Sequence, residues 1–262
     1  MGIDPTWIKT LVLQLISAGV EVQERNLQPF TLLILDERLV LHLIPIPNTF
    51  NPQQLVALQQ SYQEQGLLLV HLWADIWLTK KEQVLSRISS LLGRNNRIHG
   101  RKTKITTLDQ AAADTFLTSY HVQGSAKARY KFGLLHAGEL VAVATFSGTR
   151  PMPSRGSKHR SAELVRFACI AGVTVIGGLS KLLQHYISLV KPDDVMSYAD
   201  RDWSDGRGYS SCGFVLKEVQ EPSSLFLEPL TLQRYFAHRK PEEASGLIEI
   251  FNTGNLKYIL YL

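Results

Sequence analysis

The sequence has few cysteines, no long apolar run, and no internal repeat or low-complexity tract. Cys169 and Cys212 are the only cysteines among 262 residues, and their spacing is not that of metal ligands. We therefore expect no metal site and a reducing, intracellular environment. The amino terminus lacks a basic segment followed by an apolar one, and the longest apolar stretches are too short to cross a bilayer. These absences predict a cytoplasmic protein without a membrane partner.

Basic residues are in modest excess, with a formal net charge of +5 and a pI near 9.2. An excess of this sign favours an anionic partner, and nucleic acid is the commonest one for a basic soluble protein, with DNA favoured over RNA here. Two segments concentrate the charge. The first, residues 94–104, is either an ordinary solvated connection or a phosphate-binding segment. The second, residues 150–160, is rich in Pro, Gly and Ser, which predicts a mobile contact arm. Their candidate nucleic-acid contacts are Arg97, Arg101 and Lys102 in the first segment and Arg155, Lys158 and Arg160 in the second.

The order of apolar runs and turn residues predicts an α+β protein with two domains, 1–95 and 96–262. Hydrophobic periodicity and helix-start signals predict, in the first domain, helices after Asp4 and Asn51, a hairpin, a buried strand and an amphipathic helix. The second domain shows a β-hairpin followed by β-α-β-α-β order, which is typical of a mixed sheet with crossover helices. The main elements expected there are strands 130–136, 140–147, 163–170, 194–199 and 214–219 and helices 177–190 and 206–211.

The segment from Ser197 to Phe214 crowds charged and aromatic residues between two apolar runs. Its first part, Asp200 to Trp203, follows an expected strand, and ligands of α/β sheets usually meet catalytic groups at strand ends. A salt-bridged, solvated turn is the alternative for these charges. Trp203 either stacks on a nucleic-acid base or packs against the protein.

A strand-to-helix connection near residue 177 opens with paired glycines. Backbone amides at such a helix start can hold a diphosphate, although paired glycines also serve close helix–sheet packing. Ser180, on the first turn, either binds a phosphate or caps the helix. The candidate cofactor-binding residues of this region are Gly177, Gly178, Ser180 and Lys181.

The pattern Gly208-Tyr209-Ser210-Ser211-Cys212-Gly213-Phe214 resembles the end of a GNAT acyltransferase domain. The resemblance implies an acyl-CoA or another acyl donor, with Tyr209 protonating the departing thiolate. His121 and Asp200 are then the natural proton-handling pair, and Arg166 either forms a structural ion pair or binds the anionic donor. The sequence departs from the family pattern at Thr174, where Arg or Gln is usual, and at Leu179, where Gly or Ala is usual.

Most of the chain is also similar to a phage and bacterial group of Hef-like, or Vsr-like, homing endonucleases, and its GNAT-like part to the Mom DNA-modification protein. The motifs that carry this likeness are 121–125, 163–167, 176–182, 197–203 and 251–256, the last resembling a terminal β-hairpin. The resemblance implies a Vsr-type, restriction-endonuclease-like amino-terminal domain. Thr31 and His42 stand where its metal-binding carboxylates are expected, which predicts a degenerate nuclease.

The sequence is compatible with three functions. The leading one is acyl or aminoacyl-type transfer to an amine, on nucleic acid or a nucleobase. The second is a homing-type DNA endonuclease whose GNAT-like half only binds DNA. The third is a nucleic-acid-binding protein without catalysis. The oligomeric state is open.

Overall fold

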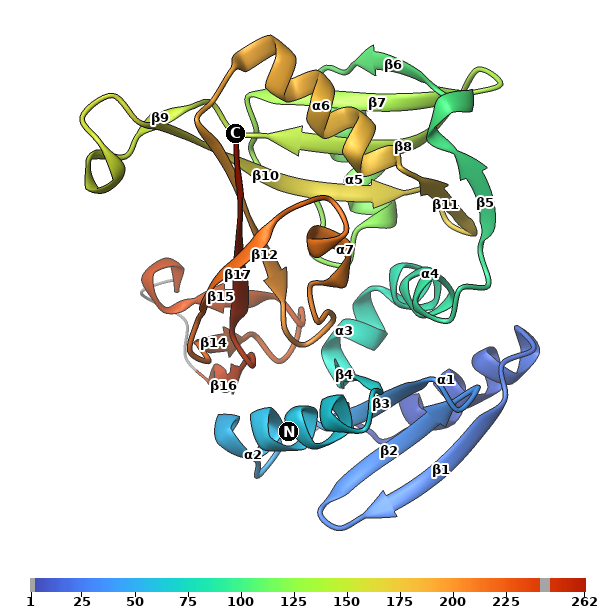
Figure 1. Ribbon diagram of the computed structural model, residues 1–262. Coiled ribbons are helices and arrows are strands. Elements are labelled where there is room, and N and C mark those ends of the chain that lie inside the picture. The colour runs from blue at the N-terminus through green and yellow to red at the C-terminus, as the bar shows by residue number, and fades with distance from the viewer. Residues whose placement is uncertain (1–2, 241–245) are drawn as a thin grey trace. The chain divides into compact units, whose positions relative to one another are not determined.

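The computed structural model describes residues 3–240 and 246–262, which form two compact units (Figure 1). Of the described residues, the first unit comprises 3–81, 199–205, 219–240 and 246–256, and the second comprises 82–198, 206–218 and 257–262. This division differs from the expected boundary between residues 95 and 96. The reason is that strands β12 (Asp194–Asp200) and β17 (Asn255–Tyr261) each end or begin in the first unit, which carries segments of the carboxy-terminal half into it.

The first unit is built on a four-stranded sheet in the order β1-β2-β3-β4. Strands β1 to β3 are antiparallel, and β4 lies parallel to β3 after the crossover helix α2. Helix α2 begins after Asn51, as the Asn-Pro signal predicts, and Asn51 and Gln54 form a reciprocal capping box there. The elements are α1 (Thr6–Ser17), β1 (Val22–Leu27), β2 (Phe30–Leu35), β3 (Leu39–Ile44), α2 (Pro52–Glu64), β4 (Leu68–Trp73) and α3 (Ala74–Thr79).

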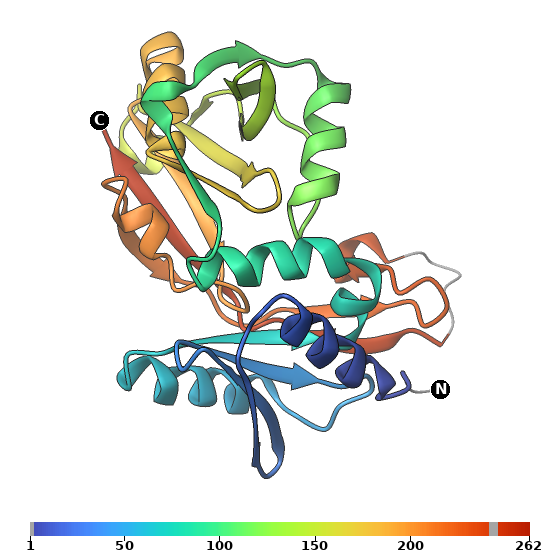
Figure 2. The ribbon, with the colours of Figure 1, turned by 90° about the vertical axis from the view of Figure 1, so that its right-hand side faces the viewer.

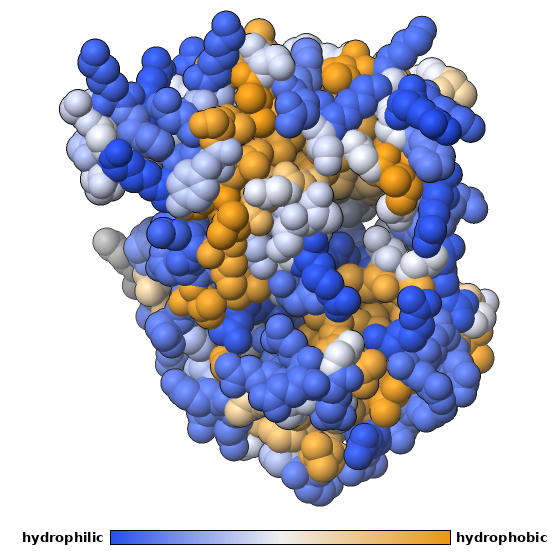
Figure 3. Space-filling view, in the orientation of Figure 1, coloured by the Kyte–Doolittle hydropathy of each residue, from blue (hydrophilic) through white to orange (hydrophobic). Residues whose placement is uncertain are grey.

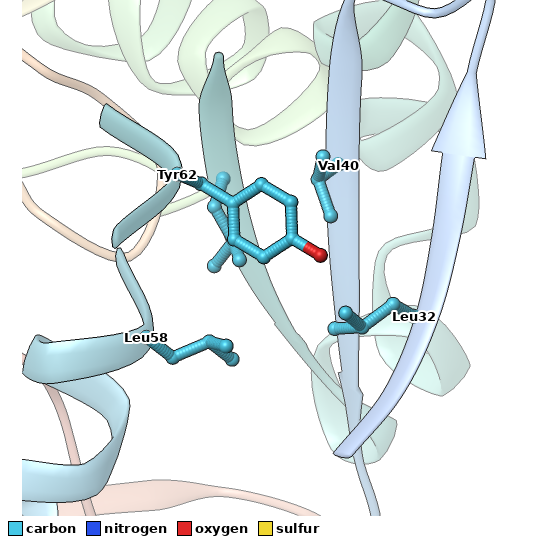
Figure 4. Packing of buried hydrophobic residues seen from close by; sticks show 5 residues of the cluster. Leu32, Val40, Leu58 and Tyr62 are labelled. Atoms are coloured by element: carbon cyan, nitrogen blue, oxygen red, sulfur yellow. The ribbon is translucent and has the colours of Figure 1, made fainter. Parts of the chain in front are cut away.

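Helix α2 packs on this sheet through a cluster of apolar side chains (Figure 4). Leu58 and Tyr62 lie one turn apart on α2 and face residues from three strands. The side chains of Leu32 and Val40 are fully buried. Burying each of them stabilises the fold by roughly 1.5–3 kcal/mol relative to leaving it exposed to water. The complete cluster is Leu32, Val40, Leu58, Tyr62 and Leu69.

A second sheet in the first unit has the order β15-β14-β16. Its strand β16 was expected to form a terminal hairpin with the strand after Gly254. Instead β16 pairs with β14, and β17 lies between β12 and β13 in another sheet, so the hairpin prediction is wrong. The positive φ of Gly254 allows the chain to turn between the two sheets. The elements are β14 (Ser224–Leu227), β15 (Arg234–Phe236), the 3₁₀ turn Ala237–Arg239 and β16 (Ile248–Phe251).

The second unit contains a large mixed sheet in the order β13-β17-β12-β10-β8-β7-β6, with β9 paired to β10. Helix α6 lies on one face and α5 on the other, as Figures 1 and 2 show from two directions. Apolar side chains of α5, such as Phe116 and Leu117, pack against Val143 and Ala168. The elements are α4 (Lys81–Leu91), β6 (Lys104–Thr107), α5 (Gln110–Tyr120), β7 (Tyr130–His136), β8 (Glu139–Phe146), β9 (Arg150–Pro151), the 3₁₀ turn Pro153–Arg155, β10 (Arg160–Cys169), α6 (Gly178–Val190), α7 (Arg207–Ser210) and β13 (Val215–Val219).

A two-stranded parallel pair stands beside this sheet. It joins β5 (Asn96–His99) to β11 (Val173–Ile176), with Arg97 opposite Thr174 and His99 opposite Ile176. The 3₁₀ turn Gly100–Lys102 then leads from β5 to β6. Among the described residues, no helix has the length and hydropathy needed to span a bilayer.

Candidate active site

The central feature of the second unit is a break in the parallel ladder between β10 and β12. The two strands pair only from Ser161 opposite Asp194 to Glu163 opposite Met196, although both continue beyond these residues. A bulge in the pairing of β10 with β8 falls between Leu164 and Arg166, at the same place. Bulges re-aim side chains and are frequent beside active sites. Beyond Glu163 and Met196 the backbone ladder between β10 and β12 is not continued.

Ser197 lies at the break and bridges the two strands. Its Oγ donates a hydrogen bond to the carbonyl oxygen of Leu164 at 2.9 Å. Next to it, the carbonyl oxygen of Tyr198 accepts a hydrogen bond from the Tyr209 hydroxyl at 3.4 Å. Ser197 lies in a segment that the sequence singles out, but a serine inside a strand carries no pattern that predicts this bridging role.

Tyr209 comes from the short helix α7 and packs edge-on against Phe214, with ring centroids 5.6 Å apart. The expected spacing of a tyrosine one turn before a Gly-Phe therefore brings the two rings together. Burial raises the pKa of Tyr209 above its ordinary value, although Ser197 and the charge of Arg166 act in the opposite direction. The phenol is thus protonated near neutral pH, which suits a proton donor rather than a base.

The start of α6 lies beside the same turn. Ser180, in the first turn of α6, places its Oγ 3.3 Å from the Sγ of Cys212, three residues after Tyr209. Gly177 adopts a φ of +70°, and no atom lies within 4 Å of the position that a Cβ would take, so its backbone is open. Gly178 serves packing instead, because a Cβ there would lie 2.9 Å from the Val175 side chain. The two glycines thus have different roles.

Arg166 binds the turn after α5 and acts on Tyr209 through its charge. Its Nε donates to the carbonyl oxygen of Gly124 at 3.3 Å, and one terminal nitrogen donates to the carbonyl oxygen of Val165 at 2.8 Å. Its charge also lowers the pKa of Tyr209 against the effect of burial. Arg166 therefore has two roles at this site: it holds the turn after α5, and its charge lowers the pKa of the Tyr209 phenol.

His121 lies on the turn that Arg166 holds. It ends α5, and its Nδ1 accepts a hydrogen bond from the backbone N–H of Gln123 at 3.1 Å. Because a backbone N–H can only donate, neutral His121 carries its proton on Nε2. The predicted role of His121 as a proton acceptor therefore requires its Nδ1 to release Gln123.

Lys181 was expected to bind a cofactor, but its ammonium group is used for structure. Its Nζ donates to the carbonyl oxygens of Gly100, at 2.9 Å, and Thr103, and lies 3.4 Å from the Thr103 hydroxyl. An ammonium group has three protons to donate, and these oxygens account for them. Lys181 thus fixes the 3₁₀ turn of residues 100–102 against α6.

The segment Asp200 to Trp203 belongs to the first unit, where it is a structural element. Asp202 is 3% exposed, and its carboxylate accepts hydrogen bonds from the N–H and hydroxyl of Thr253 and from the indole of Trp73. Burial raises the pKa of Asp202, while these donors oppose that rise. Asp200 Oδ1 accepts from the backbone N–H of Asp202 at 3.0 Å. The pairing of His121 with Asp200 stays a prediction, since the two residues lie in different units.

Trp203 does not fit its expected role as a stacking platform. Its side chain is 7% exposed, which leaves too little ring surface for a base. The packing alternative is therefore the correct one. An apolar ring is more stable in the protein interior than in water, and the turn that carries Trp203 places its ring there.

The second basic segment is anchored rather than loose. Asp194 is fully buried, and its carboxylate binds Arg155, the His159 Nε2 at 2.6 Å and the Ser161 hydroxyl at 2.5 Å. Arg155 is therefore committed to an internal ion pair and is removed from the candidate nucleic-acid contacts. Lys158 and Arg160 remain exposed, although Arg160 also donates to the Thr149 hydroxyl.

The two positions expected to replace nuclease carboxylates lie in the first sheet. His42 is fully buried, and its Nδ1 is 3.0 Å from the Nδ1 of His71 on the neighbouring strand. Thr31 is on β2, opposite Leu43. A His42 enclosed in this way has no access to a solvated metal ion. The described part of the chain contains no group of three or more His, Cys, Asp or Glu side chains placed to hold a metal.

Comparisons with known proteins give structural neighbours only. No family model matches the chain. No curated protein matches it either. Solved structures similar to it include a Bacillus subtilis acetyltransferase in complex with CoA, at 16% identity and a TM-score of 0.40, covering 62% of this chain and 99% of that one.

Two further similar structures are the ribosomal-protein-S18-alanine N-acetyltransferase from Escherichia coli and a GNAT family acetyltransferase from Elizabethkingia anophelis with acetyl-CoA bound. The first shares 14% identity over 61% of this chain and 93% of that one, with a TM-score of 0.38. The second shares 13% identity over 62% of this chain and 99% of that one, with a TM-score of 0.36. TM-scores this low do not establish a common fold, so family membership, the Vsr-type domain and the likeness to Mom stay predictions.

Proposed function

We propose that the second unit transfers an acyl group from a thioester donor, such as an acyl-CoA, to an amine. The observation that carries this proposal is the break between β10 and β12, with Tyr209 bound to the strand at that break and the start of α6 beside it. An extended thioester arm can pair with the free edge of β10, and its phosphates can meet the amides that begin α6.

The residues present fit such a donor. The open backbone at Gly177 allows close approach of a phosphate to the start of α6, which has 13 residues and carries a partial positive charge there. Ser180 supplies a hydroxyl on the same turn. Thr174 and Leu179, which depart from the usual GNAT pattern, lie on either side of this start and leave the backbone amides unchanged in number.

The donor, when bound, supplies an activated thioester carbonyl. The amine attacks this carbonyl, an N–C bond forms and the C–S bond breaks. Tyr209, kept protonated by burial, gives its proton to the departing sulfur. The proton lost by the amine goes to His121 once its Nδ1 has released Gln123. Arg166 holds the His121 turn through Gly124 during this exchange.

The acceptor that we propose is an amine on nucleic acid or on a nucleobase. The support is the basic character of the chain, with Arg97, Arg101 and Lys102 exposed near α6 and Lys158 and Arg160 exposed on the second basic segment. Mass spectrometry of nucleosides from cells with and without the protein tests this acceptor. A nucleoside of new mass identifies it, and unchanged nucleosides contradict it.

Calorimetric titration with acetyl-CoA tests the donor site through a pair of matched substitutions. Ser180→Glu places a carboxylate in the first turn of α6, where it favours the helix but repels a diphosphate. Ser180→Gln has nearly the same size without the charge. We expect the Glu variant to bind acetyl-CoA at least about tenfold more weakly than the Gln variant, a difference of about 1.4 kcal/mol. Equal affinities of the two variants contradict the donor site.

A further inference from the structure

The positive charge of the chain is concentrated in one segment. Residues 83–108 contain six Arg and Lys residues and no Asp or Glu, which gives +6, whereas the whole chain carries +5. The rest of the chain is therefore slightly acidic, at −1. A charge of one sign over so few residues is a feature of surfaces that bind polyanions.

The exposed part of this segment follows β5, the 3₁₀ turn and the start of β6. We call it the cationic strip, and it consists of Arg97, His99, Arg101, Lys102 and Lys104, all exposed. Within residues 3–240 and 246–262, no side chain forms an ion pair with these five. Figure 3 shows deep blue, hydrophilic side chains along the edge where β5 and β6 lie in Figure 1.

The strip is held on a firm scaffold. Strand β5 pairs with β11 over four residues, and Gly100 packs so closely that a Cβ there would lie 3.1 Å from the carbonyl oxygen of Ile176. Lys181 ties the turn down through Gly100 and Thr103. Because Arg97 and His99 lie two residues apart in a strand, they point to the same side, about 6.6 Å apart along the backbone. The charges are thus displayed by ordered backbone, which lowers the entropy lost on binding.

The composition of the strip selects among polyanions. Single-stranded nucleic acid is bound through aromatic side chains that stack on bases, and residues 94–104 contain no Phe, Trp or Tyr. Segments that insert into a membrane surface carry apolar side chains that enter the lipid, and Ile98, the one large apolar residue of 94–104, is partly buried. Contacts from Arg and Lys alone suit the phosphates of a duplex, which carries one charge per about 1.7 Å of its axis.

The second basic segment provides an internal contrast. Its Arg155 and His159 are bound by Asp194, and the backbone N–H of Arg160 donates to the Asp193 carboxylate at 2.6 Å. Carboxylates therefore offset much of its charge, while none lies within residues 83–108. We propose that the cationic strip binds the phosphate backbone of a nucleic-acid duplex, without reading its sequence.

Fluorescence anisotropy of the full chain with a labelled DNA duplex of arbitrary sequence tests this. The strip variant is Arg97→Glu/Arg101→Glu/Lys102→Glu. Its control, Lys9→Glu/Arg25→Glu/Arg38→Glu, changes the net charge equally at exposed positions of the first unit. We expect the strip variant to bind at least about tenfold more weakly than the control at about 100 mM salt, because neutralised phosphates dominate such binding. Circular dichroism of both variants shows that they are folded.

The salt dependence gives a second readout. Four Arg and Lys contacts predict a slope of log K against log salt near −3.6, and Arg101→Ala should reduce its magnitude by about 1. An RNA duplex of the same sequence identifies which duplex is preferred, and binding of either supports the proposal. Three results overturn it: equal loss in strip and control variants, tighter binding to single strands or anionic vesicles than to duplex, and displacement of the duplex by 3′,5′-ADP. No acyl donor is present, so failure of the proposed transfer leaves this test unaffected.

Discussion

Ser180 Oγ and Cys212 Sγ lie 3.3 Å apart, and this contact joins the first turn of α6 to the turn that carries Tyr209. In the proposed transfer, the helix start offers backbone amides to the donor and the tyrosine offers a proton, and both lie in one unit. The proposed chemistry depends on the backbone at the start of α6 and on the phenol of Tyr209.

The left-handed conformation of Gly177 should be measurable as stability. Gly177→Ala forces a Cβ into a φ of +70°, which costs roughly 1–2 kcal/mol. Gly177→Asn should cost less, because asparagine adopts this conformation more readily. Chemical unfolding followed by circular dichroism measures both variants. A stability of Gly177→Ala equal to or above that of Gly177→Asn contradicts the assigned conformation.

The buried pair His42 and His71 should make the first unit sensitive to acid. His71 Nε2 lies 3.2 Å from the carbonyl oxygen of Leu55 and so carries a proton, which makes its Nδ1 the acceptor for His42 Nδ1–H. Burial lowers the pKa of His42 to about 2 and that of His71 to about 3, both from 6.5. Both imidazoles are therefore neutral in the folded protein at pH 6.5 and somewhat below it.

Unfolded histidine takes up a proton below pH 6.5, so stability is full above that pH and falls as the pH drops toward the folded pKa values. Two such groups predict a loss of about 2.7 kcal/mol per pH unit between about pH 6 and pH 4. His42→Leu should reduce this slope to about half, whereas His99→Gln, at an exposed position, should leave it unchanged. All four tryptophans, Trp7, Trp73, Trp77 and Trp203, lie in the first unit, so their fluorescence follows its unfolding.

The ion pair of Asp75 and Arg234 is a further determinant of the first unit. Two nitrogens of Arg234 donate to the Asp75 carboxylate at 2.6 and 2.7 Å, and Asp75 is 1% exposed. Arg234→Met leaves a buried carboxylate without its partner and should cost about 3–5 kcal/mol. The double variant Asp75→Leu/Arg234→Met should recover most of that loss. Urea unfolding monitored by tryptophan fluorescence measures the free energy of unfolding of each variant. A double variant no more stable than the single one contradicts the proposed cost of the unpaired carboxylate.

Asp194 should control the proteolytic sensitivity of residues 150–160. Asp194→Asn removes the charge that holds Arg155 and His159, at a cost of about 1.5–3 kcal/mol in hydrogen bonding to charged groups. Trypsin should then cut after Arg155 and Lys158 about ten times faster or more. Asp193→Asn keeps an acceptor for the Arg160 N–H and serves as the control. Equal cleavage rates in the two variants would show that Asp194 does not restrain the loop.

Local patterns predict the elements better than their assembly. The hairpin strands at Phe30–Leu35 and Leu39–Ile44 and the helix after Gly177 agree with the structure because alternation, periodicity and glycine act over a few residues. The strand β1 was not expected, because five of its six residues are exposed and its sequence lacks the alternation of apolar and polar residues that indicates a strand. The return of residues 199–205 to the first unit depends on the acceptor role of Asp202 toward Thr253, 51 residues away, which no local pattern reveals.

In the candidate site too, local features are predictable from the sequence and long-range contacts are not. Tyr209 and Gly177 are recognisable because a turn and a helix start need those residue types at those places. The structural use of Lys181 and Arg155 was not predictable, because their partners are a turn carbonyl and a buried carboxylate distant in sequence. The sequence alone does not distinguish a cationic side chain that faces solvent from one that binds an internal oxygen.

The most direct test of the transfer site is single-turnover release of thiol from acetyl-CoA in the presence of an amine acceptor, with Tyr209→Phe beside the unchanged protein. The substitution removes one hydroxyl and keeps the ring contact with Phe214, so folding should persist. We predict that Tyr209→Phe binds acetyl-CoA with unchanged affinity and releases thiol about 10²–10⁴ times more slowly. Release at the full rate by Tyr209→Phe would contradict the proposed role of Tyr209 and, with it, the transfer site.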